Sequence, residues 1–162
     1  MGRGEGGVSE AAAKRERILA VDYGRKRMGL ALSDELGVTA RPLATISRVN
    51  RRRDMSRLRE TCRAHGVTHI IVGLPLHMTG EAGEMAEEAA RFGARLEKET
   101  GIGVELVDER LTSWEAERTV AETRPRVRRK GQAIDDVAAA ILLRDYLDRG
   151  RERAESAGTG RA

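Results

Sequence analysis

The run at residues 18–22 (ILAVD) constrains the fold more than any other part of this chain. Four successive apolar residues ended by an acid are typical of a strand that is covered on both faces of a sheet. The turn-like residues 23–27 separate this run from a second one at residues 28–32 (MGLAL), and a third follows at residues 41–46. Because such short connections suit antiparallel neighbours, we predict a meander of three strands.

The later part of the chain alternates between helical and strand patterns. Apolar residues at helical spacing, or a capping box in the case of Thr112 and Glu115, predict four helices, and short apolar runs predict two more strands. The predicted helices are 51–65, 81–100, one beginning at 112, and 134–147, and the strands are 70–72 and 104–108. The order β-β-β-α-β-α-β-α-α implies an α/β protein with a five-stranded mixed sheet flanked by helices, in which two parallel strands join the three antiparallel ones.

Length and composition limit the classes of protein that this chain can represent. One pattern spans residues 17–149 of 162, which predicts a single domain, and residues 1–16 and 150–162 lack an apolar period and are predicted to be disordered. The single cysteine, Cys62, excludes an internal disulfide and predicts an intracellular, cytoplasmic protein. No apolar run approaches the ~18 residues of a membrane helix. One Trp, two Tyr and one Phe are too few for a base-stacking platform.

Acidic residues occur at three places where a carboxylate is costly. Asp22 ends an apolar strand, Asp108 and Glu109 end another, and Asp135 and Asp136 begin the apolar last helix. Carboxylates that gather repel one another unless a cation neutralises them, and hard oxygen ligands suit Mg²⁺ or Mn²⁺. Two such ions about 4 Å apart would hold the attacking and leaving oxygens of a phosphodiester during cleavage.

Each of these acids also has a purely structural interpretation. Asp135 and Asp136 could complement a helix dipole, Asp108 could pair with an arginine, and Asp22 could serve as a turn acid. Asp34 follows the second strand and is typical of a turn. The three histidines lack metal-ligand spacing, so a zinc site is not indicated.

Basic residues lie beside two of the acidic positions. Arg25 and Arg27 follow Asp22 in a glycine-containing turn, and the run from Arg128 through Arg129 to Lys130 precedes Asp135. Such clusters, with a further one at residues 51–53, provide salt-dependent and sequence-independent contacts to a nucleic-acid backbone. A solvated basic face is the alternative. No glycine loop is followed by Lys-Ser/Thr, which excludes a Walker A site.

Four stretches, in this order, resemble the motifs of one family. They are residues 22–34 (DYGRKRMGLALSD), 73–80 (GLPLHMTG), 108–113 (DERLTS) and 130–135 (KGQAID) with the alanines that follow. Over roughly residues 17–148 the chain is similar to the YqgF (RuvX-like) family. The resemblance implies an RNase H-like fold, with which the predicted sheet is compatible. It also implies that Asp22, the Asp108–Glu109 pair and Asp135 form a divalent-metal site. Asp135 is preferred to Asp136 because it occupies the motif position.

The chain departs from related patterns at two positions. Many RNase H-like nucleases carry an acid at the end of the fourth strand, where this chain has Gly73-Leu74-Pro75. An acid on the fifth strand must then take its place. His77 stands where asparagine is common in the family, which affects the side-chain role of that loop but not its backbone.

The family is associated with nucleolytic processing of the 5′ end of pre-16S rRNA, and was earlier proposed to resolve Holliday junctions. We therefore predict a metal-dependent hydrolase of RNA phosphodiesters in ribosome biogenesis. Arg25, Arg27 and the basic run 128–130 are the predicted substrate contacts. Two alternatives stay open: a resolvase of branched DNA, which calls for a homodimer rather than a monomer, and a non-catalytic RNA- or ribosome-binding factor. A sugar-kinase-like ATPase shares the Asp-x-Gly turn but needs a second lobe.

Overall fold

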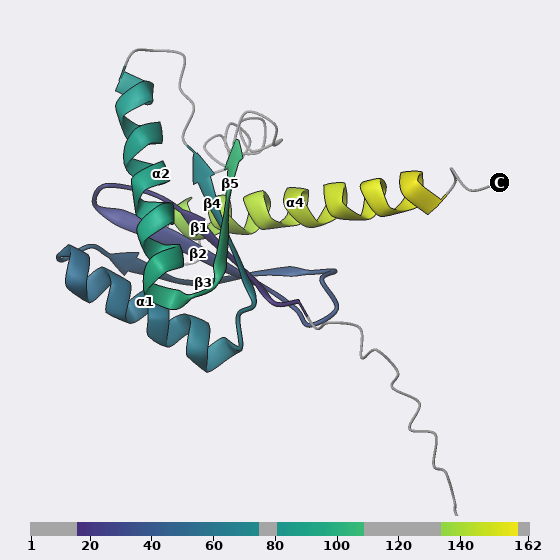
Figure 1. The fold of residues 1–162 in the computed structure, drawn as a ribbon, viewed down its shortest axis with the longest axis horizontal. Helices are drawn as coiled ribbons and strands as arrows, with labels where there is room; N and C mark the ends of the chain where they lie inside the picture. Colours follow the sequence, from purple (N-terminus) through teal and green to yellow (C-terminus); the bar gives the residue numbers. More distant parts are fainter. Residues whose placement is uncertain (1–15, 75–80, 109–133, 159–162) are drawn as a thin grey trace, which may run out of the picture.

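The computed structural model describes residues 16–74, 81–108 and 134–158, which form one mixed sheet with helices on both faces (Figure 1). The strand order is β3-β2-β1-β4-β5. Antiparallel pairing joins β1 to β2 and β2 to β3, whereas β4 pairs parallel to β1 and β5 parallel to β4. The strands are β1 (Ile18–Asp22), β2 (Arg27–Ser33), β3 (Ala40–Ser47), β4 (His69–Leu74) and β5 (Gly103–Asp108). The predicted five-stranded α/β fold is confirmed.

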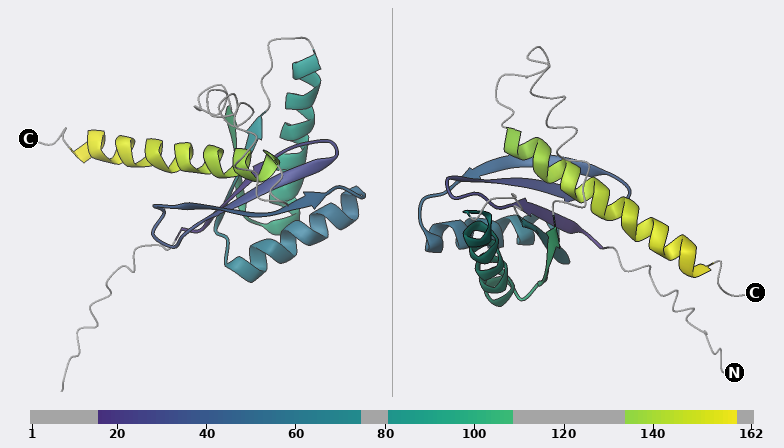
Figure 2. Two further views of the ribbon diagram at one scale, coloured as in Figure 1. Left: turned by 180° about the vertical axis from the view of Figure 1, so that it is seen from behind. Right: turned by 90° about the horizontal axis from the view of Figure 1, so that it is seen from above.

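Within the described residues, three helices cover this sheet. They are α1 (Arg51–His65), α2 (Glu81–Thr100) and α4 (Ile134–Gly158). Figure 2 shows α1 and α2 on one face of the sheet and α4 on the other. The first two helices have the bounds that the sequence predicts. The predicted helix at 112 and the loop at 124–131 lie outside the described residues.

Local capping explains the sharp bounds of α1. The Asn50 side chain accepts a hydrogen bond from the backbone N–H of Arg53, and Gly66 ends the helix in the left-handed conformation at φ 63°. The apolar stripe of the helix, which includes Leu58 and Cys62, is buried against the sheet. Burial raises the pKa of the Cys62 thiol to about 11, so this cysteine is a core residue and not a nucleophile.

The first strand is buried on both faces, as its sequence predicts. Leu19 and Val21 pack into the core beneath α1 and α2. Ile18 and Ala20 pack into a second core beneath α4, together with Ala139 and other residues of that helix. This alternation fixes which face each residue of β1 occupies.

The last helix is longer than its sequence pattern predicts. We predicted a helix at 134–147 and a disordered tail from residue 150, but α4 continues to Gly158, so the prediction is wrong for residues 150–158. These residues are exposed and extend past the sheet (Figure 1), so no apolar period marks them. Arginine, glutamate and alanine have high helix propensity, and Arg151 pairs with Asp148 one turn earlier. None of the helices in residues 16–74, 81–108 and 134–158 is both long and apolar enough to cross a membrane.

Candidate functional site

Asp22 ends β1 where the three parallel strands β1, β4 and β5 finish. We call this end of the sheet the carboxyl edge. Val21 and Tyr23, its two chain neighbours, pack into the core beneath α1 and α2. Because side chains alternate along a strand, Asp22 lies on the opposite face, the one that α4 covers. Its side chain is partly buried there.

Glycines occupy both positions beside Asp22 in the sheet. Asp22 is paired with Gly29 on β2 and with Gly73 on β4. A strand glycine carries no side chain, so it leaves the sheet surface open to close approach by another group. Asp22 is therefore flanked on both sides of the sheet by residues without a side chain.

The α4 helix begins near the carboxyl edge, the end of the sheet at which β1 finishes. The Tyr146 hydroxyl lies 3.4 Å from Nε2 of His69, the residue that starts β4, so α4 reaches the amino end of the parallel strands at this point. Asp135 is eleven residues earlier, about 16 Å back along the helix axis. That distance is about the length of a five-residue strand. The backbone of Asp135 therefore lies toward the carboxyl edge, where Asp22 is found; its side chain lies outside the described part of the structure.

Asp108 ends β5 at the same edge, but on the other face of the sheet. Val107 packs into the core beneath α4, whereas Leu106 faces α2, since a Cβ on Gly93 of that helix would lie 3.0 Å from it. Alternation then assigns Asp108 to the α2 face with Leu106. Two strand spacings, about 10 Å, also separate β5 from β1. Asp22 and Asp108 therefore share an edge without sharing a face.

A buried polar network holds the chain just beyond Asp22. Arg48 donates from Nε to Asp54 (3.2 Å) and from Nη1 to the Tyr23 hydroxyl (3.0 Å) and the Gly24 carbonyl (3.2 Å). The second carboxylate oxygen of Asp54 accepts the Val49 N–H, and Asp54 is only 1% exposed. The sequence does not predict this network; its one signal is Asp54, an acid in the first turn of α1.

The turn itself depends on Gly24. A Cβ at this position would lie 2.3 Å from the backbone oxygen of Arg27, a distance that no substitution can accommodate without moving the turn. The network and the glycine together fix the backbone that follows Asp22. The position of the carboxylate is therefore set by the buried core and not by a free loop.

Arg25, one of the predicted substrate contacts, is bound to α2. Its Nη2 and Nε donate to the two carboxylate oxygens of Glu88 at 2.8 and 3.2 Å. The hydrogen bond from Arg25 lowers the pKa of the Glu88 carboxyl. The Arg25 side chain is still 55% exposed. Arg27, at the start of β2, is exposed and has partners of its own.

The remaining predicted site residues lie outside the described residues: Glu109, Arg128, Arg129 and Lys130. The same is true of His77. Within residues 16–74, 81–108 and 134–158, no cluster of three or more His, Cys, Asp or Glu side chains is arranged to hold a metal ion. Asp34 has the turn role that its position predicts, because its Oδ1 accepts the backbone N–H groups of Val38 (2.7 Å) and Thr39 (3.1 Å).

Comparison with solved structures defines the fold class. The chain is similar to a Thermus thermophilus RuvC in complex with Holliday junction substrate, with a TM-score of 0.52 over 83% of this chain and 96% of that one. Sequence identity is 16%, so this likeness concerns the fold alone. The molecule is an RNase H-like α/β protein.

Sequence comparison narrows the class to a family. A family model described as "RuvX: Holliday junction resolvase" matches residues 16–149. A protein of Koribacter versatilis (strain Ellin345) is 41% identical over 149 residues, 91% of this chain and 97% of the relative. One of Moorella thermoacetica (strain ATCC 39073 / JCM 9320) is 45% identical over 133 residues, 82% and 95% of the two chains. Both relatives carry the name "Putative pre-16S rRNA nuclease". The chain belongs to the RuvX family, which confirms the resemblance in its motifs.

Proposed function

We propose that this chain is a metal-dependent nuclease that hydrolyses RNA phosphodiesters and processes the 5′ end of pre-16S rRNA. The observation that carries the proposal is Asp22, a partly buried carboxylate at the carboxyl edge, flanked in the sheet by Gly29 and Gly73. The names of relatives more than 40% identical over most of the chain support the activity and the substrate. Cleavage of pre-rRNA assigns the protein to the cytoplasm.

The donor chemistry of this edge fits Mg²⁺ or Mn²⁺. Carboxylate oxygens are the ligands that both ions prefer, and a partly buried carboxylate next to bare backbone leaves room for an ion and its waters. We assign ion binding to Asp22, Asp135 and the Asp108–Glu109 pair. Such an ion would supply Lewis-acid activation of a water and stabilisation of the negative charge on the phosphate oxygens.

The residues of the chain then orient and hold the substrate. Asp22 is positioned by the fixed turn behind it, and the glycines at 29 and 73 admit a phosphodiester close to the sheet backbone. Arg27 and the basic run 128–130 supply contacts to neighbouring phosphates. Arg25 can do so only if it leaves its bidentate contact with Glu88.

The test is a cleavage panel with Mg²⁺ and with Mn²⁺. The substrates are a pre-16S 5′ leader RNA, an unstructured single-stranded RNA and a four-way DNA junction. We expect cleavage of the leader RNA that depends on the metal and stops when the metal is chelated. Binding of the leader without cleavage under any metal would contradict the proposal and favour a non-catalytic RNA-binding factor.

The family description favours one second candidate, a resolvase of branched DNA. That activity needs two sites presented to opposed strands, and therefore a homodimer. Preference for the four-way junction over RNA in the panel, by a protein that sediments as a dimer, would select this candidate. A monomer that prefers RNA would exclude it.

Asp108, which ends β5, and Glu109, the next residue in the chain, should contribute unequally to the cleavage rate. Because Asp108 lies on the face away from Asp22, we assign the metal contact of this pair to Glu109. Glu109→Gln is expected to lower the cleavage rate by at least about 100-fold, and Asp108→Asn by less than about 10-fold. The reason is that only the Glu109 substitution removes a negative charge that contacts the ion. Initial rates with Mn²⁺ measure both effects. Greater loss in Asp108→Asn would reverse the assignment.

A further inference from the structure

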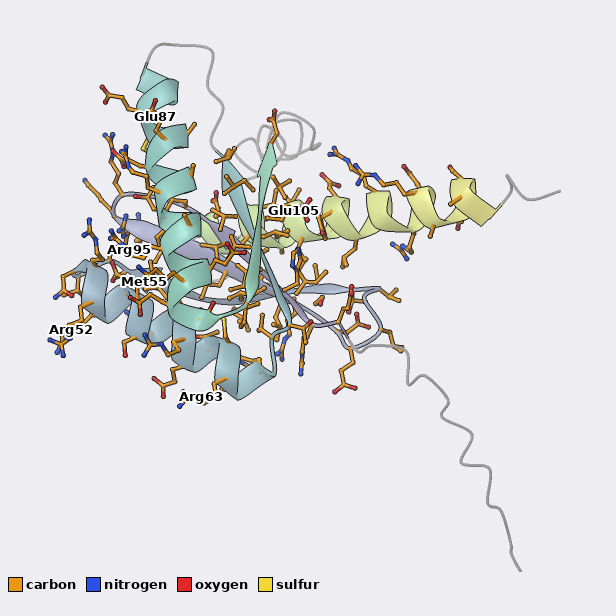
Figure 3. All side chains as sticks on the ribbon, viewed as in Figure 1. Arg52, Met55, Arg63, Glu87, Arg95 and Glu105 are labelled. Carbon is orange, nitrogen blue, oxygen red and sulfur yellow. The ribbon has the colours of Figure 1, made fainter. Side chains whose placement is uncertain are left out.

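A hollow of about 290 Å³ lies between α1 and α2, on the sheet face opposite to α4. Arg51 from the first turn of α1 and Arg91 and Arg95 from α2 line it, above an apolar floor that includes Met55 and Phe92. Figure 3 labels Arg95 and Met55 where the two helices meet. We call this place the arginine hollow.

The carboxylates of the arginine hollow are already paired with other groups. Asp54 is bound by Arg48 at 3.2 Å, and Glu88 by Arg25 at 2.8 Å. A fourth arginine of the lining, Arg48, is the partner of Asp54. Within the described part of the chain, Arg51, Arg91 and Arg95 make no ion pair or side-chain hydrogen bond of their own. Glu88, already paired with Arg25, also interacts electrostatically with Arg91. The hollow therefore carries excess positive charge.

The arrangement of the three guanidinium groups suits an anion with several oxygens. Arg91 and Arg95 are four residues apart and so lie on one side of α2, while Arg51 approaches from a different helix. Arg51 also stands at the amino end of α1, where the helix dipole favours negative charge. Guanidinium groups that approach from two directions match the geometry of a phosphate, to which each can donate two hydrogen bonds.

We propose that the arginine hollow binds a backbone phosphate of the substrate strand, away from the point of cleavage. The inference rests on the proposed function, because that function supplies the strand. Tyr23 connects the two places: it follows Asp22 directly, and its side chain lines the hollow. Arg25 lies at the turn between them and contacts α2 through Glu88. A strand that passes around the carboxyl edge from Asp22 therefore reaches the hollow.

The test measures binding of fluorescein-labelled single-stranded RNA to the full chain in EDTA, so that cleavage does not interfere. The double variant Arg91→Gln/Arg95→Gln should bind a long RNA about 10-fold more weakly near 0.1 M salt. The slope of log affinity against log salt should fall by about 0.7 for the lost phosphate contact. Arg91→Lys/Arg95→Lys keeps both charges and should retain the slope of the wild type.

A matched control separates this site from a general effect of charge. Arg41→Gln/Arg63→Gln removes the same charge from exposed positions outside the hollow, on β3 and at the end of α1. The control should lose less than about 3-fold in affinity, because scattered surface charges act only at long range. Equal losses in the two double variants, or no loss in the hollow variant, would overturn the proposal.

RNA length gives a second readout, which also separates this proposal from the proposed function. RNAs too short to reach from the carboxyl edge to the arginine hollow should bind the wild type and the hollow variant with equal affinity. The difference in affinity between the two proteins should appear only as the RNA is lengthened. A deficit that is the same at every length would contradict the proposal. If the wild type cleaves no RNA but the hollow variant alone loses long-RNA binding, the nuclease proposal fails and the phosphate site stands.

Discussion

Asp22→Asn is expected to slow Mn²⁺-dependent cleavage of a pre-16S leader RNA by about 1,000-fold or more, while the protein remains folded. A bound divalent ion contributes several kcal/mol to stabilising the transition state, and each 1.36 kcal/mol corresponds to about tenfold in rate. Asparagine has nearly the same shape as aspartate but no charge to hold the ion. The flanking residues Gly29 and Gly73 have no side chain that could replace the lost carboxylate. Initial cleavage rates at saturating Mn²⁺ measure the effect.

Asp34→Asn is the matched control for this substitution. Asp34 also follows a strand directly, but it lies at the opposite edge of the sheet and caps the turn between β2 and β3. Hydrogen bonds from the backbone N–H groups of Thr39 and Val38 lower the pKa of its carboxyl, and asparagine keeps an acceptor oxygen for them. The control should cleave at the rate of the wild type. Undiminished activity in Asp22→Asn would remove the site as proposed.

Asp54→Ala is expected to lower the free energy of unfolding by about 3 kcal/mol, because it leaves a largely buried guanidinium without its carboxylate. Asp54 is 1% exposed and binds both Arg48 and the Val49 N–H. For a domain of this size, about 3 °C per kcal/mol gives a fall in Tm of about 10 °C. Urea unfolding and thermal scans measure the loss. Cleavage should fall as well, since Arg48 fixes the turn after Asp22.

An exposed ion pair between α1 and α2 provides the comparison. Arg59 on α1 contacts Glu99 on α2, and both side chains are more than 40% exposed. Glu99→Ala should therefore cost less than about 1 kcal/mol. If both variants lose the same stability, Asp54 does not form the stabilising buried network described above.

Much of the fold could be predicted from the sequence, because apolar periodicity records burial. The bounds of α1 and α2 and the two-sided burial of β1 follow from it directly. The extension of α4 to Gly158 could not be predicted in this way, because a helix exposed on every side has no period. Its only signals were residue propensity and the pair between Arg151 and Asp148.

The sequence points to candidate residues for the site but does not show how they are arranged in space. That Asp22 ends a buried strand is visible in the sequence, whereas its flanking by Gly29 and Gly73 depends on strand register, which is a long-range property. The same holds for Asp108, because the sheet face on which it lies depends on how the neighbouring residues of β5 pack against α2 and α4. Arg25 is a predicted phosphate contact, and the sequence does not reveal that Glu88 lies beside it in space.

We propose that Asp22 belongs to a divalent-metal site. Calorimetric titration of Mn²⁺ into the wild type and into Asp22→Asn, without nucleic acid, tests it most directly. We predict a saturable binding heat for the wild type that is lost in the variant, with both proteins equally folded by circular dichroism. Equal heats from the two proteins would contradict the claim.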